Sequence, residues 1–203
     1  MKSTLQGTTI AIIAGTLGQG GAERQLLYIL QALQHLEVRT VVLSMAKGEF
    51  YEQQINDLGI EVVHIGASES RLQRVRAAIR AVRNAGADAV AGMHLYVTLY
   101  AAVAGKWLGI PSIGAIRNDA YSEVAPLGIL GKPSLTLPDE VAANSRIGFE
   151  NAIAIGAKRE KMFFLPNVVN TERFHPTDER EERTPKRLIA VGRLEPQKRM
   201  DRF

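Results

Sequence analysis

The sequence predicts an α/β protein with an open, doubly wound and mostly parallel sheet of about seven strands, flanked by helices in a Rossmann-like arrangement. Two observations predict this fold class. Apolar runs of strand length alternate along the chain with amphipathic stretches of helix length, which is the pattern of parallel βαβ units. The apolar runs are also rich in Val, Ile and Ala without strict alternation, as expected of strands that helices cover on both faces.

The predicted elements follow one another with short turns. Residues 8–14 ("TTIAIIA") form the first strand, four glycines follow within 15–21, and a helix over 22–35 has apolar residues at three- and four-residue spacing. The same patterns predict the later elements. The strands are expected at 39–45, 60–66, 87–93, 111–117, 139–145 and 161–167, and the helices at about 50–58, 69–84, 95–108 and 146–156.

Two regions interrupt this alternation. Residues 118–138 contain three prolines and little periodicity, which predicts a long loop of the functional or mobile kind. The charged stretch "HPTDEREERTPK" predicts a linker over 175–185. We therefore expect a first domain over 1–174 and the start of a second over 186–203. Because the sequence ends where a new helix begins, we expect that second domain to be truncated.

Composition limits the classes of function. The 203 residues carry a net charge of +4, and no basic run is interleaved with aromatic residues, so nucleic acid is not expected as a partner. The absence of cysteine excludes disulfides and thiolate chemistry and fits a reducing cytosol. No cluster of His, Asp and Glu has the spacing of metal ligands, so no metal site is expected.

The glycine-rich turn after the first strand predicts a phosphate site. A strand, a tight turn and a helix N-terminus direct unpaired N–H groups and the helix dipole at the turn. Gly20 and Gly21 are expected to let a phosphate or sugar approach the backbone. A dinucleotide is not favoured, because Glu23 stands in place of the third fingerprint glycine and the second strand ends without an acidic residue. The alternative is a tight turn that only joins strand and helix.

Polar residues follow three further strands. His94 comes after the strand at 87–93, Arg117 and Asn118 after that at 111–117, and Asn144 and Ser145 after that at 139–145. Ligands of parallel sheets bind beyond the carboxyl ends of the strands, so these residues are expected to line a cleft. Each has a structural alternative: a surface or core histidine, a loop arginine held by a helix, and, for Ser145, the N-cap of the next helix.

Two basic residues near the end of the sequence give the strongest signal for chemistry. Arg193 lies on a turn after an apolar strand, and Lys198 lies near the next helix start. A guanidinium grips a diphosphate through two parallel bonds and an ammonium adds a point charge, so the pair suits a nucleotide diphosphate leaving group. The alternative is a pair of surface cations.

The predicted helix at 69–84 carries five arginines, of which Arg76, Arg80 and Arg83 share one arc beside an apolar stripe. This pattern indicates a solvated face or, as the alternative, docking on anionic lipid or on a charged acceptor. The apolar strand within 186–194 has no sheet of its own. We expect it to be disordered or to pair with a neighbouring molecule in a strand-swapped dimer.

Three segments together resemble family 4 glycosyltransferases of the GT-B fold. The segment "LGQGGAER" is similar to the glycine-rich loop of that family, "LPNVVNTERFHP" to its interdomain element "PNGVDxxRFxP", and "AVGRLEPQKRMD" to the start of its second domain, "VGRLxxxKGxD". They occur in the family's order and span the whole chain. Val168, Asn170 and Arg199 depart from the pattern, which has glycine, aspartate and glycine there.

The resemblance implies two Rossmann-like domains with the active site between them, the first binding mainly the acceptor and the second a nucleotide sugar. It implies transfer with retention of the anomeric configuration and without a metal. By position, Gly20 and Gly21 would face the donor diphosphate, His94 would approach the transferred sugar, and Arg193 and Lys198 would hold the diphosphate. The paired-glutamate motif of the family does not occur within the 203 residues.

The predicted function is that of the N-terminal part of a retaining hexosyltransferase of polysaccharide biosynthesis. It would move a sugar from a UDP- or GDP-linked donor to a glycan or lipid-linked acceptor, with no cofactor beyond the donor. We expect a cytoplasmic protein with peripheral contact at the inner membrane face, and we expect the 203 residues alone to be inactive. Two alternatives remain: a sugar-nucleotide epimerase of the same fold, and a non-catalytic module that binds a glycan or nucleotide.

Overall fold

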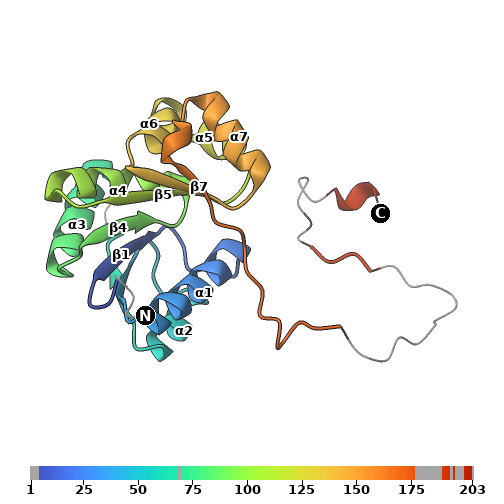
Figure 1. The fold of residues 1–203 in the computed structure, drawn as a ribbon, viewed down its shortest axis with the longest axis horizontal. Coiled ribbons are helices and arrows are strands. Elements are labelled where there is room, and N and C mark those ends of the chain that lie inside the picture. The colour runs from blue at the N-terminus through green and yellow to red at the C-terminus, as the bar shows by residue number, and fades with distance from the viewer. Residues whose placement is uncertain (1–4, 68–69, 177–188, 193, 195–198, 203) are drawn as a thin grey trace, which may run out of the picture. The chain divides into compact units, whose positions relative to one another are not determined.

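Seven parallel strands form one sheet in the order β3-β2-β1-β4-β5-β6-β7 (Figure 1). The computed structural model describes residues 5–67, 70–176, 189–192, 194 and 199–202. The sheet confirms the predicted doubly wound α/β fold, and each of the seven strands predicted between residues 8 and 167 is present, shorter by one to four residues. The strands are β1 (Thr9–Ala14), β2 (Arg39–Ser44), β3 (Glu61–His64), β4 (Ala89–Gly92), β5 (Ser112–Ile116), β6 (Glu140–Ala143) and β7 (Met162–Phe164).

Helices cover both faces of the sheet, as the apolar strands predict. Within β1, Ala11 and Ile13 belong to one buried cluster, which includes residues of the third and fourth helices. Ile12 and Ala14 belong to another, which includes residues of the first and second helices. The alternation of Cβ directions along a strand produces this division. The helices at predicted positions are α1 (Gly21–His35), α2 (Glu52–Asp57), α3 (Arg71–Asn84), α4 (Leu95–Leu108) and α7 (Arg146–Ile155).

The region 118–138 is helical, so the prediction of a long loop is wrong. It forms α5 (Ala120–Val124), the 3₁₀ helix η1 (Ala125–Leu130) and α6 (Gly131–Thr136). The carboxylate of Asp119 caps α5 by accepting bonds from the N–H groups of Tyr121 and Ser122. Prolines stand in the first turns of η1 and α6, where a missing N–H costs little. Helices this short hold too few turns for periodicity to reveal them.

The chain divides into two compact units, Met1–Val168 and Val169–Phe203. The first holds the sheet, its helices and the 3₁₀ helix η2 (Arg159–Lys161); the second includes η4 (Met200–Arg202). Most of the predicted linker at 175–185 lies outside the described residues, as do 186–188 and 193 of the predicted swapping strand. The domain limits and the strand-swapped dimer therefore stay predictions.

The last residue of the first unit, Val168, is bonded to a residue near the start of that unit, Gln25. After β7 the chain reaches α1, where the Gln25 side chain binds the backbone of Val168 in both directions. Nε2 of Gln25 donates to the Val168 carbonyl and the Val168 N–H donates to Oε1 of Gln25, each at 2.8 Å. The second unit begins at Val169, directly after a residue whose backbone is bonded to α1.

Candidate functional site

The strand order brings the predicted site residues to one edge of the sheet. β1 and β4 lie side by side, and the chain leaves them for α1 on one sheet face and α4 on the other. Ligands of open parallel sheets bind at such a switch point, beyond the carboxyl ends of the strands. The glycine-rich turn follows β1 here, and His94 follows β4.

A buried acid–base pair spans the switch point. Nε2 of His94 lies 3.2 Å from Oε1 of Glu23, and the two side chains are only 12% and 8% exposed. Burial alone would raise the pKa of Glu23; the hydrogen bond from His94, the bond from its own backbone N–H and the His94 charge outweigh burial and hold that pKa below its ordinary value. Because a carboxylate only accepts, Nε2 carries the proton of this bond, whereas Nδ1 is buried with no partner among the described residues.

An aromatic ring fixes the other side of the imidazole. Tyr96 stacks on His94 with ring centroids 5.4 Å apart and an interplanar angle of 26°. Its hydroxyl lies against Gly15, where a Cβ atom would stand 1.8 Å from the oxygen. Burial, with the nearby charges of Glu23 and Glu49, raises the pKa of Tyr96 to about 12, so the hydroxyl stays protonated at neutral pH.

The glycine-rich turn is held by a carboxylate from the loop after β2. Glu49 accepts hydrogen bonds from Oγ1 of Thr16, at 2.8 Å, and from the Leu17 N–H. The N–H of Gly18 donates to Oγ1 of Thr16 at 3.0 Å, and that of Gly20 to the Gly18 carbonyl at 2.9 Å. Several amides that could bind a phosphate are therefore already bonded within the protein.

Gly20 and Gly21 differ in what surrounds them. A Cβ atom on Gly20 would stand 2.1 Å from Oε2 of Glu23, so this glycine makes room for the buried carboxylate. A Cβ atom on Gly21 would meet no atom within 4 Å. Packing within the chain therefore accounts for the first glycine and leaves the backbone of the second open to a ligand.

Arg117 turns back toward the loop that carries His94. Its Nε donates to the Met93 carbonyl at 3.2 Å, and its backbone N–H and that of Asn118 both donate to Oε1 of Glu123. Burial lowers the pKa of Arg117, partly offset by the charge of Glu123. Burial also raises the pKa of Glu123, against the pull of three backbone N–H groups and His94. Arg117 and Glu123 thus brace the edge behind His94.

Asn144 and Ser145 support the same edge from β6. Nδ2 of Asn144 donates to the Arg117 carbonyl at 2.9 Å and to Oδ1 of Asn167 at 3.4 Å. Oγ of Ser145 accepts from the Gly148 N–H at 3.0 Å, which confirms Ser145 as the N-cap of α7. The structure thus brings Gly20, His94, Arg117 and Asn144 to one edge of the sheet. Each of these residues forms a hydrogen bond with another residue of the chain.

Arg193 and Lys198 lie outside the described residues, so their predicted role at a diphosphate stays a prediction. Within the part of the chain that the structure describes, no group of three or more His, Cys, Asp and Glu side chains could hold a metal ion. No described helix is both long and apolar enough to cross a membrane.

The sequence profile named "Glycosyl transferase 4-like domain" matches residues 20–168, from the glycine-rich turn to the contact with Gln25. The chain belongs to this family. No similar sequence was found among curated proteins. The matched range includes all of the acid–base pair, the braced edge and six of the seven strands.

Solved structures share the fold of this glycosyl transferase 4-like domain. The structure of Anabaena Alr3699/HepE in complex with UDP and glucose has a TM-score of 0.67 at 16% identity, over 84% of this chain and 47% of that one. The lipopolysaccharide outer core galactosyltransferase WaaB, in its apo form, has 0.62 at 15%, over 80% and 46%. The UDP-N-acetylglucosamine 2-epimerase of Rickettsia bellii has 0.58 at 17%, over 79% and 45%. The chain thus shares the fold of one part of these proteins and spans less than half of the length of each.

Beside the stacked ring of Tyr96, the glycosyl transferase 4-like domain has a cavity of about 340 Å³. Gly15, Tyr96, Arg71 and Arg74 line it, and Leu130 of η1 closes one side. It adjoins the Tyr96–His94 stack and combines apolar walls with two guanidinium groups. The mis-predicted region 118–138 therefore supplies part of the site's wall.

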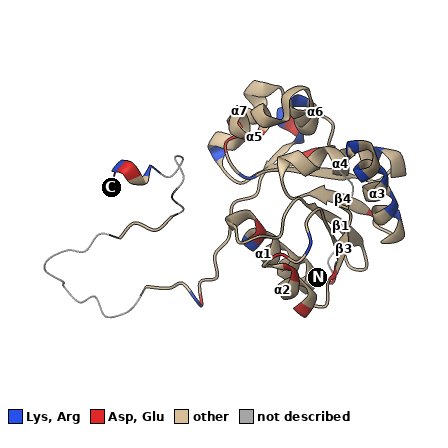
Figure 2. Cartoon of the chain, turned by 180° about the vertical axis from the view of Figure 1, so that it is seen from behind, with Lys and Arg blue, Asp and Glu red and all other residues tan. Residues whose placement is uncertain are grey.

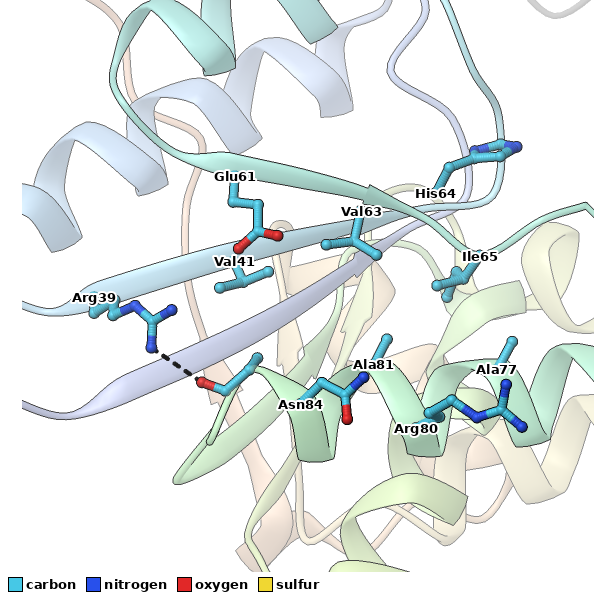
Figure 3. A pocket seen from close by; sticks show the side chains of 11 residues that line it. Arg39, Val41, Glu61, Val63, His64, Ile65, Ala77, Arg80, Ala81 and Asn84 are labelled. Carbon is cyan, nitrogen blue, oxygen red and sulfur yellow. Dashed lines mark hydrogen bonds between the residues drawn. The ribbon is translucent and has the colours of Figure 1, made fainter.

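Another cavity, of about 350 Å³, runs along the sheet edge between β3 and α3 (Figure 3). Glu61 and Arg80 face it from opposite elements, and Nη1 of Arg39 donates to the Ala85 carbonyl at 3.1 Å. None of the predicted site residues lines it. We therefore place the functional site at the switch point and not in this cavity.

Sequence reasoning missed four residues of the site: Glu23, Glu49, Tyr96 and Glu123. The position of Glu23 was a usable signal. A carboxylate in the first turn of a helix either interacts with the helix dipole or accepts a hydrogen bond from a nearby basic side chain. Glu49 and Glu123 lie in segments with no local pattern, whereas Tyr96 lies in a predicted helix; no pattern in the sequence relates any of the three to His94.

Proposed function

We propose that this chain is the acceptor-side part of a retaining, metal-independent hexosyltransferase. It would take a sugar from a UDP- or GDP-linked donor and pass it to a glycan or lipid-linked acceptor at the cytoplasmic face of a membrane, in polysaccharide assembly. The observation that carries the proposal is the buried Glu23–His94 pair at the switch point, in a member of the glycosyl transferase 4-like family. The complexes of Anabaena Alr3699/HepE with UDP and with UDP-glucose support a nucleotide sugar as the donor.

In this proposal each side chain of the site has one task. His94 contacts the transferred sugar, and Glu23 is a positioning residue that holds the imidazole through Nε2. The open backbone at Gly21 admits the donor diphosphate, whose charge Arg193 and Lys198 offset. Glu23 and Glu49 repel an anion at the glycine-rich turn, so the proposal depends on those two cations.

Calorimetric titration tests whether donor binding requires residues of a second domain in addition to this chain. UDP, GDP and their glucose and mannose conjugates are titrated into this chain and into a longer form with a complete second domain. Tight binding by the longer form alone supports the proposal and names the base. Equal binding by both forms overturns it, because the glycine-rich turn would then be a complete nucleotide site.

Product analysis tests the chemistry. The longer form is expected to give a glycosylated product only when an acceptor is present, and His94→Ala is expected to lower kcat by about a hundredfold or more. His35→Ala is the matched control, since His35 is exposed on α1. A product epimerised without acceptor would favour the epimerase, whose fold this chain also shares. Binding with no turnover of any donor would favour the non-catalytic module.

A further inference from the structure

The outer faces of α3 and α4 form a surface that the site at the switch point does not use. We propose that this surface docks on a membrane containing anionic lipid and inserts Trp107 among the headgroups. The α3–α4 surface, as named here, consists of Leu72, Arg76, Ile79, Arg80, Arg83 and Trp107. The inference rests on the proposed function only for its acceptor, and lipid binding is measured without sugar transfer.

The apolar part of the surface is a groove between the two helices. The groove has a volume of about 530 Å³, with Val75, Ile79 and Val103 among its lining residues. Trp107 and Leu72 stand at it with 70% and 59% of their surface exposed. An indole left this far in water gains little from folding. Tryptophan is enriched at the membrane–water interface, where its ring is apolar and its N–H stays hydrated.

The charged part of the surface is of one sign. α3 and α4 together hold five arginines, one lysine and no acidic residue, whereas the whole chain has a net charge of +4. The rest of the chain is therefore net negative, and basic residues recur along α3 (Figure 2). Arg76, Arg80 and Arg83 are exposed and form no ion pair with any described residue.

Charge complementarity decides between the possible occupants. A second copy of the chain docked on the same face would bring the same arginines together, and like charges oppose that contact. A neutral apolar partner would leave three guanidinium groups at its edge without counter-charge. An anionic bilayer supplies phosphate and glycerol oxygens to the arginines and an apolar layer to Trp107, which matches both parts of the surface.

Docking would also place the site near the lipid. Arg71, the first residue of α3, lines the cavity beside Tyr96, and Val75 lines both that cavity and the groove. The groove that would face the bilayer therefore adjoins this cavity at Val75, and we take the cavity as the place of the acceptor. A lipid-linked acceptor could then reach the cavity while its chain stays in the membrane.

The single tryptophan of the chain makes the test direct, because Trp107 is the only indole that reports. The 203-residue chain is mixed with vesicles of phosphatidylcholine alone and of phosphatidylcholine with an equal part of phosphatidylglycerol. With the anionic vesicles we expect co-sedimentation, an emission maximum at shorter wavelength and protection of Trp107 from iodide. With the neutral vesicles we expect none of these, and high salt should reverse the binding.

Two sets of variants locate the contact. Changing Arg76, Arg80 and Arg83 together to Gln should lower the partition coefficient about a hundredfold, since each arginine near an anionic surface contributes roughly a fivefold gain. The matched control changes Lys132, Lys158 and Arg159 to Gln, which removes the same charge elsewhere and should lower partitioning far less. Circular dichroism of both variants checks that they are folded.

Three outcomes would overturn the inference. One is equal loss of binding in the two triple variants, because the vesicles would then attract the net charge of the protein and not the α3–α4 surface. Another is binding without any change in Trp107 emission, since the indole would then stay in water. The third is a concentration-dependent emission shift in the absence of vesicles, which would assign the surface to a second copy. Sugar transfer that persists after any of these leaves the proposed function intact.

Discussion

Nε2 of His94 donates to Oε1 of Glu23 across the junction between β1 and β4, at 3.2 Å and almost out of contact with water. Glu23 lies in the first turn of α1 and His94 is the N-cap residue of α4, and these two helices cover opposite faces of the sheet. A glycine before the carboxylate and an aromatic ring on the imidazole both serve this contact. Neighbouring residues therefore hold the pair in place at the edge where parallel sheets bind their ligands.

Glu23→Gln should destabilise the fold in a pH-dependent way. The folded-state pKa of Glu23 lies below its ordinary value of 4.5, so its stabilising contribution is present above pH 4.5 and is lost as the pH falls through the folded-state pKa. We expect the variant to lose about 2 kcal/mol at pH 7 and the difference from the parent chain to shrink in acid. Urea unfolding followed by far-ultraviolet circular dichroism measures this. Glu160→Gln, at an exposed position, is the control, and a pH-independent difference would contradict the prediction.

Glu123→Ala should cost about 3 kcal/mol, because the N–H groups of Arg117 and Asn118 lose a shared acceptor. Glu123→Gln should recover most of this, since an amide oxygen still accepts both bonds. Thermal unfolding of the two variants compares them. Equal losses would mean that the carboxylate acts through its charge on Arg117 and not as a hydrogen-bond acceptor.

Gly15→Ala should displace the Tyr96 ring from its place on His94, because the new Cβ atom would lie within 2.2 Å of three ring and hydroxyl atoms. We expect a loss of about 1–3 kcal/mol, typical of overpacking. The double variant with Tyr96→Ala should show no added cost from the alanine at 15. A full cost in both backgrounds would place the strain in the backbone of the turn instead.

Ser145→Ala should cost about 1 kcal/mol, since it removes the acceptor that caps the Gly148 N–H. Ser145→Asp should keep the cap and most of the stability. The effect is local, so hydrogen exchange should quicken at the first turn of α7 and not at α1. Unchanged exchange at Gly148 with Ala at 145 would show that the cap contributes nothing.

Gln25→Ala should release Val168, whose N–H and carbonyl both bind the glutamine side chain. We expect faster hydrogen exchange and earlier protease cleavage at residues 165–170, with little change in the unfolding free energy. Gln53→Ala, which removes an exposed bond to Asp57, is the control. Cleavage equal to that of the parent chain would show that Gln25 does not fix the segment.

The sequence predicted most of the fold, because strands buried on both faces have a local signature. Residues 10–14 are all apolar, and β1 occupies them together with Thr9. The cap at Ser145 was also predictable, since a cap depends on the few residues that follow it. The helices in 118–138 were not, because none of them spans enough turns to show an apolar face.

The site was predictable only in outline. The position of His94 after a strand indicated the edge of the sheet, as did those of Arg117 and Asn144. The sequence marks Glu23, the partner of His94, only as a departure from a glycine pattern, and no spacing rule relates two residues on helices that cover opposite faces of a sheet. Contacts of this kind depend on strand order, which local sequence patterns do not contain.

The bonds between Gln25 and Val168 also have a mechanical consequence. A force applied to residues beyond Val168 acts on α1 through these two hydrogen bonds as well as on β7 through the backbone. Gln25 lies two residues from Glu23, so the load enters the protein beside the carboxylate that holds His94. Tension in the chain beyond Val168 would therefore act on the helix turn whose carboxylate holds the His94 imidazole.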